Sequence, residues 1–235
     1  MSSGDNRLWY RSARSFGFFM KGQIAHLFAI LILIPVVWAF AAPVMDGGTI
    51  FGVRDTTWFW LAVGIPVFHQ TLVWIVFRAQ LGWAAFSKLF GHFDLFVWGV
   101  LFLPLLVLRP ILIVGLALVT ERTLMLSKII SISLALILIV PSLYTLWSVI
   151  RYFGLIRAMG GDHFRISFRK MPLVRQGAFK YSANAMYTFA FFLLWSVALI
   201  IGSQAALSVA LFEHAYIWVH YYCTEKPDME IIYGS

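Results

Sequence analysis

Two ionisable residues, Glu213 and His214, stand inside an otherwise apolar run and are the first feature of the sequence that could do chemistry. Ionisable groups within a membrane-spanning segment are energetically costly and commonly mark functional sites. A carboxylate or an imidazole in this position could act as a general base that takes a proton from a reacting amine. The alternative is structural, because Glu213 could instead form an ion pair with a basic residue of another helix, such as Arg109.

A second candidate region is the polar stretch 151–183, in which seven basic residues accompany one acidic residue, Asp162. Apolar residues alternate with these charges, which predicts a segment folded against the membrane face rather than a disordered one. Glycines at positions 160, 161 and 177 offer flexible backbone beside cationic side chains, a combination suited to an anionic ligand. His163 adds a third candidate base. The alternative is that the arginines only follow the positive-inside rule and bind anionic lipids.

A third candidate is the tail from Glu225 to Gly234, EKPDMEIIYG, which brings acidic residues to the side of the membrane that carries the basic stretch. It could contribute to the same site. A simple polar terminus would have the same composition, so both interpretations remain open at this point.

The composition defines the class of protein that must position these residues. Hydrophobic residues make up 61% of the 235 residues and charged residues 12%, about half of the roughly 25% charged residues typical of soluble domains. An ordinary water-soluble enzyme is therefore excluded. The single cysteine, Cys223, cannot form an internal disulfide, and no Cys/His spacing indicates a zinc site. We expect no metal.

Six apolar runs are long enough to be considered as membrane spans: 24–44, 57–77, 93–119, 128–150, 184–202 and 205–222. The third run contains Pro104 and the pair Arg109-Pro110, so we expect it to be kinked or broken there, either as one helix or as a re-entrant pair. The fifth and sixth runs are separated only by Gly202-Ser203-Gln204, which predicts a tight helical hairpin.

The predicted fold is an all-α polytopic membrane protein with five or six transmembrane helices, a cytoplasmic segment and a C-terminal helical hairpin. We divide it into four N-terminal spans over residues 1–150 and a C-terminal region over 151–235. The latter consists of the basic segment 151–183, the hairpin 184–222 and the tail 223–235.

Basic residues predict the orientation of this bundle. The net charge is +8, but most basic residues fall between apolar runs, which reports topology and not nucleic-acid binding. In the six-span arrangement fourteen basic residues lie on the side of the termini, starting with Arg7, and three on the other side: Arg54, Arg122 and Lys128. The positive-inside rule then places both termini in the cytoplasm. The first 23 residues have no short apolar stretch ending in small residues, so no cleavable signal peptide is predicted.

From Gly154 onward the sequence resembles the integral-membrane methyltransferases that include phosphatidylethanolamine N-methyltransferases and isoprenylcysteine carboxyl methyltransferases. Three pieces carry the resemblance: GLIRAMGGDHF (154–164), LVRQGAFKYSANAMY (173–187) and the tail EKPDMEIIYG. Ala183 and Ala185 stand where the family has an arginine and a proline, and Glu225-Lys226 stands where it has two glutamates. Arg175 or Lys180 could supply the missing positive charge. The tail resembles the phospholipid branch more than the prenylcysteine branch.

The resemblance implies a site for S-adenosylmethionine between the middle piece and the last helix, with the lipid acceptor entering from the bilayer. Leu173 and Val174 would offer backbone groups to the adenine, and Gly177 and Phe179 would line it. Asn184 and Tyr187 would approach the amino-acid end of the cofactor, and Glu225 would hold its amine or ribose. Tyr181 completes the expected cofactor-binding set. Glu213, His214 and His163 are the candidates for the catalytic base.

The implied activity is S-adenosylmethionine-dependent methyl transfer to a membrane lipid, with the amine of phosphatidylethanolamine or of a methylated intermediate as the expected acceptor. Two alternatives remain. One is a carboxyl or thiol methyltransferase acting on a prenylcysteine-like or small hydrophobic acceptor. The other is a non-catalytic lipid-binding or transport protein, for which a broken third span would be suited. The expected partners are the lipid substrate and the bilayer, either the bacterial inner membrane or the endoplasmic reticulum.

Overall fold

The computed structural model describes residues 11–234 and is 81% helical, which confirms the predicted all-α polytopic membrane fold. Arg7, included in the count of basic residues above, lies outside the described residues. Four helical stretches are long and apolar enough to cross a membrane: Phe16–Val44, Asp55–Trp83, Ala85–Val119 and Lys128–Phe153. Within these stretches the long α-helices are α2 (Gln23–Ala41), α3 (Asp55–Trp83), α5 (Asp94–Val119) and α6 (Lys128–Ser148).

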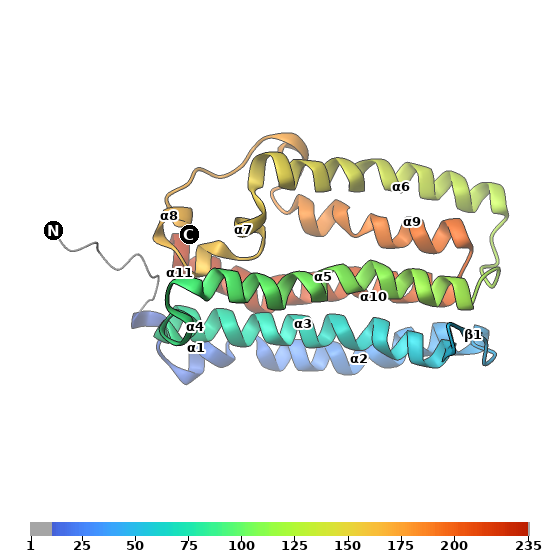
Figure 1. The fold of residues 1–235 in the computed structure, drawn as a ribbon, viewed down its shortest axis with the longest axis horizontal. Coiled ribbons are helices and arrows are strands. Elements are labelled where there is room, and N and C mark those ends of the chain that lie inside the picture. Colours follow the sequence, from blue (N-terminus) through green and yellow to red (C-terminus); the bar gives the residue numbers. More distant parts are fainter. Residues whose placement is uncertain (1–10, 235) are drawn as a thin grey trace.

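The C-terminal hairpin is formed by two shorter helices that run alongside the four long ones (Figure 1). They are α9 (Phe192–Ile201) and α10 (Gln204–His220). Gly202 ends α9 with a φ of 77°, a left-handed conformation that glycine adopts without strain. The predicted hairpin is therefore present, and its two arms together with the long helices make a six-helix bundle.

The third apolar run is one continuous helix, which decides between the two alternatives that the sequence left open. Pro104 and Pro110 both lie inside α5. A proline removes one backbone donor and disfavours the helix locally, yet in a membrane a broken helix leaves polar backbone groups without water. Packing of α5 against α3, α9 and α10 keeps the segment helical. The re-entrant pair that the sequence left open is thus not formed.

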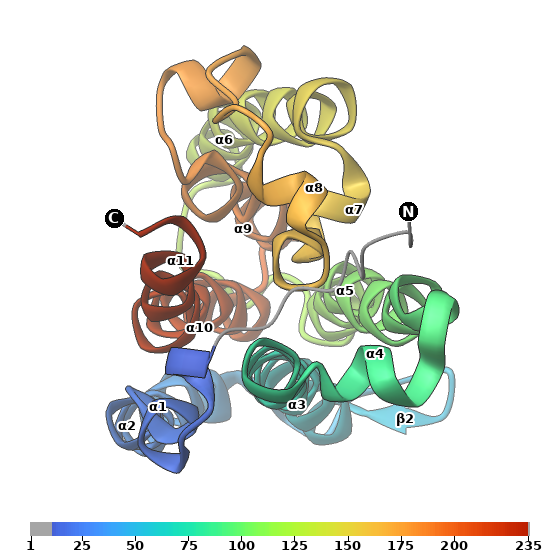
Figure 2. The same ribbon diagram turned by 90° about the vertical axis from the view of Figure 1, so that its left-hand side faces the viewer.

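The helices form two layers when the bundle is viewed along its axis (Figure 2). α2, α3, α5 and α10 lie together, with α10 in contact with each of the other three. α6 and α9 pack mainly against each other and make the second layer. α5 and α10 connect the two layers, because both also contact α9. Side chains on α10 are therefore placed where both layers meet.

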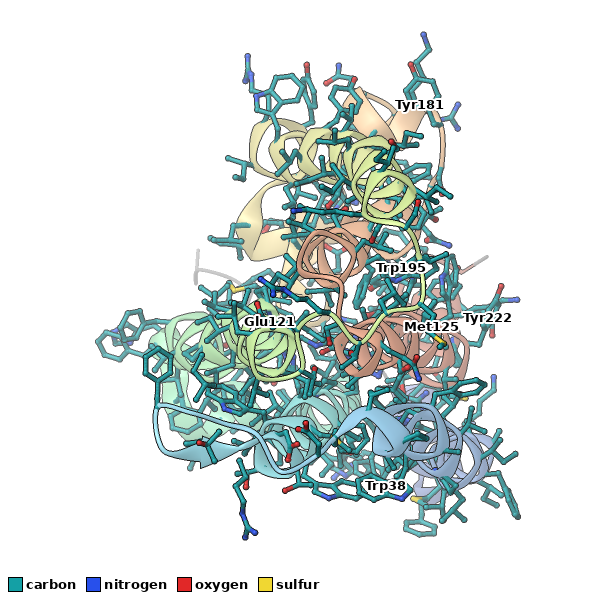
Figure 3. All side chains as sticks on the ribbon, turned by 90° about the vertical axis from the view of Figure 1, so that its right-hand side faces the viewer. Trp38, Glu121, Met125, Tyr181, Trp195 and Tyr222 are labelled. Carbon is teal, nitrogen blue, oxygen red and sulfur yellow. The ribbon has the colours of Figure 1, made fainter. Side chains whose placement is uncertain are left out.

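One end of the bundle carries short connections. It consists of the hairpin of β1 (Thr49–Ile50) and β2 (Val53–Arg54), the 120–127 loop and the turn at Gly202. The backbone N–H of Leu124 donates to the carbonyl of Gly202 at 2.9 Å, which ties the loop to the turn. Figure 3 shows this end, with Glu121 and Met125 on the loop between α5 and α6.

The opposite end carries the remaining short helices and both ends of the described chain (Figure 1). They are α1 (Phe16–Met20), α4 (Ala85–Phe90), α7 (Leu155–Ala158), α8 (Ile166–Arg169) and α11 (Lys226–Tyr233). Short 3-10 helices accompany them at Arg11–Ala13, Gly91–Phe93, Gly161–His163 and Gly177–Lys180, and a further one follows α2 at Ala42–Val44. We call this the loop end of the bundle.

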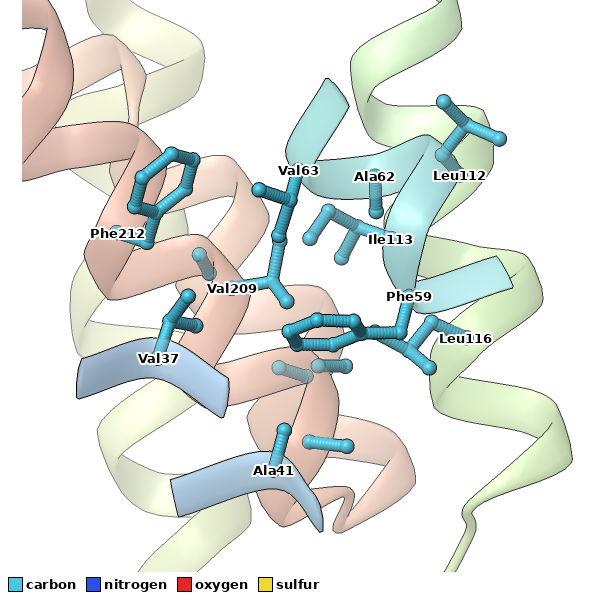
Figure 4. Close-up of a cluster of buried hydrophobic side chains, with 14 of the residues drawn as sticks. Val37, Ala41, Phe59, Ala62, Val63, Leu112, Ile113, Leu116, Val209 and Phe212 are labelled. Atoms are coloured by element: carbon cyan, nitrogen blue, oxygen red, sulfur yellow. The ribbon is translucent and has the colours of Figure 1, made fainter. Parts of the chain in front are cut away.

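The main core lies among α2, α3, α5 and α10 (Figure 4), and α9 adds Leu194 and Ala198 to it. Small residues at the start of α10, such as Ala206 and Ala210, are fully buried and let the helices approach closely. Phe59 of α3 and Leu116 of α5 fill the space above them. Gly115 is required at its position because a Cβ there would lie 2.4 Å from the ring of Trp58.

Candidate active site

Among the described residues, three π-helical segments lie at the loop end of the bundle. They lie at the end of α6 (Val149–Phe153), before α9 (Met186–Ala190) and after α10 (Tyr221–Glu225). π-Helical turns are rare and occur frequently at functional sites, because the extra residue re-aims the side chains around it. The second segment carries Tyr187 and the third ends at Glu225, so two predicted cofactor-binding residues lie on such turns.

The structure brings Tyr187 and Glu225 into direct contact. The hydroxyl of Tyr187 donates to Oε2 of Glu225, across 38 residues of sequence. The Glu225 side chain is 20% exposed, and its Oε1 lies 3.6 Å from Nε2 of His220. Burial raises the pKa of Glu225 above its usual value, and the nearby Asp228 adds to this. The result is a mostly enclosed carboxylate that a cationic or hydrogen-donating ligand would stabilise.

Aromatic rings surround the same pair. The ring centroid of Tyr187 lies 6.1 Å from that of Trp218 and 5.8 Å from that of Tyr221. Trp218 and Tyr221 in turn meet edge to face at 5.7 Å. Ring faces attract cations, most strongly where water is excluded. A carboxylate and several aromatic rings at one place therefore suit a positively charged ligand.

The segment leading to Glu225 is held in place by Arg78, which comes from the end of α3. Its side chain is fully buried and forms an ion pair through Nε with Oδ1 of Asp228. Nη2 of Arg78 also donates to the backbone carbonyls of Cys223 and Thr224, at 3.4 and 3.3 Å. Arg78 thus binds the chain on both sides of Glu225 and fixes where its carboxylate lies.

Sequence reasoning did not find Arg78 or Asp228 as site residues. Arg78 was counted only as a topology marker, and Asp228 was one charge of a polar tail. The available signal was weak: one arginine at the end of an apolar run and one acid three residues after Glu225. Neither position identifies its partner, because the two residues meet only in the folded bundle.

His163, predicted as a base, lies against the same anchor. Its Nε2 is 3.3 Å from Oδ2 of Asp228, and its ring stacks on Phe77 at a centroid distance of 3.8 Å. The imidazole therefore holds the 161–163 turn to both α3 and the tail. His163 is therefore connected to Asp228, and the structure does not place the His163 ring beside Tyr187.

A second contact ties the tail to the polar segment. The hydroxyl of Tyr233 donates to Oδ2 of Asp162, and Arg157 forms an ion pair with the same carboxylate at 3.4 Å. Arg157 also donates through Nη1 to the carbonyl of Pro172 at 3.1 Å. Burial and the bond to Asp162 raise the pKa of Tyr233 to about 12, so the phenol remains a donor at physiological pH. The polar segment is folded on the bundle, as predicted.

The middle piece of the resemblance, residues 173–187, is fixed against the end of α6, and we call it the signature segment. Gly177 has a φ of 60°, and a Cβ there would lie 2.4 Å from Oγ of Ser148. The neighbouring N–H of Ala178 donates to this hydroxyl at 3.0 Å. Phe179 is buried and stacks on Phe153 at 5.1 Å. These contacts give Gly177 and Phe179 a positioning role, whereas their predicted contacts with adenine stay a prediction.

The other predicted cofactor residues differ in exposure. Leu173 and Tyr181 are 68% and 73% exposed, and Val174 packs at the edge of the cluster around Phe179. The backbone carbonyl of Asn184 accepts from the N–H of Tyr187 at 2.9 Å, at the start of the segment that carries Tyr187.

The two positions that depart from the family pattern differ in their exposure. Ala183, which replaces the arginine, is exposed, and Ala185, which replaces the proline, is fully buried. Ala185 belongs to the same cluster as Val149 and Phe179. Arg175 and Lys180, the candidate substitutes for the missing charge, are both exposed.

Glu213 and His214 lie deeper in the bundle and point to different neighbours. Glu213 is fully buried and its Oε2 is 3.0 Å from Nε of Arg109, the ion pair that the sequence left as an alternative. The ring of His214 lies among aromatic residues of the α9 region, with Phe191 and Trp195 both at 5.4 Å. Glu213 is about 18 Å from Glu225 along a straight helix. The three candidate bases therefore do not converge on one point.

A buried polar chain runs from α2 to the turn before Glu225. Nε2 of Gln23 donates to Oγ1 of Thr224 at 3.1 Å, and Oε1 of Gln23 lies 2.9 Å from Nδ1 of His26. Nε2 of His26 is 2.7 Å from the hydroxyl of Tyr216. His26 thus has a partner on each ring nitrogen, and the chain links the first long helix to the last.

Residues 130–235 match the family model for phospholipid methyltransferases. The resemblance predicted from the sequence is confirmed. The match begins in α6 and includes the signature segment, the hairpin and the tail, so it contains all of the predicted site residues. We call residues 130–235 the methyltransferase segment; the family implies a membrane-embedded phospholipid methyltransferase. No curated protein sequence and no solved structure matches the chain.

The residues at the loop end fit the methyl donor that methyltransferases of this kind generally use, S-adenosylmethionine. This donor carries a positive sulfonium and a positive amine. The Glu225 carboxylate and the rings of Tyr187 and Tyr221 provide the charge and the aromatic faces that such a molecule needs. The ring of His220, buried next to this carboxylate, has nitrogens without a hydrogen-bond partner in the described chain and is therefore available to a ligand.

Proposed function

We propose that this protein transfers a methyl group from S-adenosylmethionine to the amine of phosphatidylethanolamine or of a methylated intermediate. The observation that supports this most is the Tyr187–Glu225 hydrogen bond, which joins two separate pieces of the methyltransferase segment at the loop end. The sequence resemblance implies cofactor binding for both residues. Their meeting at a mostly buried, aromatic-lined carboxylate is what a binding site for a cationic cofactor requires.

The chemistry needs little from the protein apart from position. S-adenosylmethionine supplies a methyl group on a sulfonium whose sulfur leaves with the bonding electron pair. Holding donor and acceptor in reactive geometry can contribute about 7–11 kcal/mol. In this role Glu225 and Tyr187 hold the amino-acid end or ribose, and Leu173 and Val174 present backbone groups to the base. Gly177 keeps the signature segment against α6.

The acceptor requires one more function. At neutral pH the ethanolamine amine is protonated, and an ammonium has no lone pair with which to attack. A general base must therefore take one proton for each methyl group transferred. Glu213, His214 and His163 remain predictions for this role.

An apolar groove supports a lipid acceptor. It has a volume of about 610 Å³ and lies between α5 and the α7 region, lined by residues that include Phe96, Leu103, Ile156 and Met159. Its position on a membrane-spanning helix suits an acyl chain that enters from the bilayer. Met159 is anchored by a hydrogen bond of 2.7 Å from Nε1 of Trp98 to its carbonyl, which makes one wall of the groove firm.

Titration of the detergent-solubilised protein with S-adenosylhomocysteine, followed by calorimetry, tests the cofactor site without assuming an acceptor. We expect micromolar binding that weakens at least tenfold in Glu225→Ala. Glu230→Ala is the matched control, because Glu230 is the other glutamate of the tail and its side chain is 43% exposed. Absence of binding by the wild type, or equal binding by Glu225→Ala, contradicts the proposed site.

A second experiment tests the acceptor. Protein reconstituted with labelled S-adenosylmethionine should methylate phosphatidylethanolamine and should not label a lipid that lacks an amine. Labelling only of thiol or carboxylate acceptors would support the alternative class of methyltransferase. Cofactor binding without transfer to any acceptor would support the non-catalytic alternative, although the continuous α5 removes the broken span on which a transport function rested.

A further inference from the structure

His220 occupies an unusual position next to the proposed cofactor carboxylate. It lies on α10, is fully buried, and neither ring nitrogen has a hydrogen-bond partner among the residues that the structure describes. Its Nε2 is 3.6 Å from Oε1 of Glu225. Buried polar groups nearly always have a partner, and a native exception calls for a specific explanation such as a catalytic role.

Ionisable groups from every neighbouring element face His220. They are His26 of α2, His69 of α3, Arg109 of α5, His163 of the 161–163 turn and Glu225. Three of them are already engaged: His26 with Gln23 and Tyr216, Arg109 with Glu213, and His163 with Asp228.

His69 resembles His220, because neither of its ring nitrogens has a hydrogen-bond partner within residues 11–234. Its ring, however, packs on Phe102 of α5 at 4.6 Å, and no contact joins it to Glu225. Among these buried histidines, His220 therefore has two features together: its ring nitrogens have no hydrogen-bond partner in the described residues, and its ring lies beside the Glu225 carboxylate.

We propose that His220 is the general base that takes the proton from the acceptor ammonium. This inference rests on the proposed function. An N–H bond of the ammonium breaks, its electron pair stays on nitrogen as the lone pair that attacks the methyl group, and the proton bonds to the free ring nitrogen. Glu225, next to the ring, stabilises the imidazolium by its charge. Because Glu225 is partly exposed, the proton can then leave to solvent past its carboxylate.

This assignment differs from the bases predicted from sequence. Glu213 and His163 already face charged partners, and His214 lies among aromatic rings. His220 was not singled out because a histidine near the end of an apolar run, followed by two tyrosines, has no distinctive pattern. The position of His220 next to Glu225 depends on the π-helical turn Tyr221–Glu225, which sets the distance between the two side chains.

The test compares His220→Gln with His26→Gln, a matched variant of another buried histidine that lies next to His220 and is not in contact with Glu225. At neutral pH, His220→Gln should methylate phosphatidylethanolamine about 10²- to 10⁴-fold more slowly. Its rate should then rise about tenfold per pH unit, because only amine that has lost its proton spontaneously can react. The affinity for S-adenosylhomocysteine, measured by calorimetry, should stay within about twofold of the wild type.

A lipid with a thiol in place of the amine provides an internal comparison that does not depend on how much variant is folded. A thiol loses its proton more easily than an ammonium, so His220→Gln should lose much less activity on the thiol lipid. If His220→Gln does not fold, His220→Asn takes its place in the same comparison.

The outcomes separate this inference from the proposed function. Wild-type protein that neither binds S-adenosylhomocysteine nor methylates an amine overturns both. If the wild type is active, the inference alone is overturned by a His220→Gln variant with the wild-type pH profile, or by equal losses on amine and thiol acceptors.

Discussion

The methyltransferase segment and the helices that precede it contribute to the site in different ways. The segment provides Tyr187 and Glu225, residues that a sequence motif can identify. The preceding helices α2, α3 and α5 lie outside the family match, yet each sends buried polar side chains to the segment. Gln23 binds Thr224, Arg78 binds Asp228, and Arg109 binds Glu213. The motif therefore identifies the chemical groups, and the unmatched helices determine where those groups lie.

A further contact between the two parts fixes the polar segment itself. Nη1 of Arg165 donates to Oδ2 of Asp94 at 2.8 Å, and Nη2 of Arg165 binds the other oxygen of the same carboxylate. Bidentate pairs of this kind restrict orientation as well as distance. The start of α5 thus holds the turn that carries Asp162 and His163.

The largest expected effect comes from removing the main anchor between the two parts. Arg78→Met leaves the Asp228 carboxylate buried without its guanidinium partner, so we expect the free energy of unfolding to fall by about 3–5 kcal/mol. Thermal or denaturant unfolding in detergent measures this. Arg122→Met serves as the control, because that side chain is 86% exposed and its loss should change stability by less than about 0.5 kcal/mol. Equal stabilities would show that α3 does not anchor the tail.

An intermediate effect should come from Gly177→Ala, which tests a contact inside the methyltransferase segment. The added Cβ meets Oγ of Ser148 at 2.4 Å, and the positive φ adds backbone strain, so we expect a loss of about 1–3 kcal/mol together with weaker cofactor binding. Gly154→Ala separates the two causes: it has a φ of +87° with no atom within 4 Å of the added Cβ. If both variants lose the same stability, strain alone accounts for the effect.

Tyr187→Phe should have a smaller effect that is confined to ligand binding. The substitution removes the hydroxyl bonded to Glu225 and keeps the ring. Hydrogen bonds to charged groups are worth about 1.5–3 kcal/mol, but Glu225 is partly solvated, so we expect S-adenosylhomocysteine affinity to fall about tenfold. Tyr222→Phe, on an exposed ring of the same aromatic group, is the control. An unchanged affinity in Tyr187→Phe would remove the central contact from the site.

The smallest effect concerns pH. Burial raises the pKa of Glu225, so in the free protein its carboxyl is protonated at higher pH than usual. The protonated carboxyl of Glu225 contributes to the free energy of unfolding at low pH, and this contribution is lost as the pH rises through the raised pKa. A cationic ligand needs the ionised form, so its affinity should increase a fewfold over the same rise. Calorimetry of S-adenosylhomocysteine from pH 5 to 8 measures this, and a flat profile in Glu225→Gln is expected.

Much of the fold could be predicted from the sequence because apolar runs of sufficient length correspond directly to helices in a membrane. The second run, predicted at 57–77, lies within α3, and the fourth begins at Lys128, as α6 does. The sequence left open whether the third run is one helix or a re-entrant pair, because the local effect of Pro104 and Pro110 competes with tertiary packing. The sequence contained the prolines but not the neighbours that keep α5 helical.

The site was predictable to a lesser extent. Motif order indicated Tyr187 and Glu225, and the structure joins them. Arg78, Asp228 and His220 were missed because each depends on a partner from another helix. Glu213 and Arg109 are an intermediate case, because the sequence suggested their ion pair and the structure shows it, whereas a catalytic role of Glu213 stays a prediction.

The π-helical turn Tyr221–Glu225 also has a meaning for the history of the chain. A turn of this kind is what a single inserted residue produces when the rest of the helix is too well packed to shift. Deleting one residue there would return the turn to α-helical spacing, while the packed helix α10 before it and the tail anchored by Arg78 after it keep their places. The change would fall on the side chains inside the turn, and the Glu225 carboxylate would lose its place beside Tyr187. One residue in this turn therefore decides whether the carboxylate and the phenol meet.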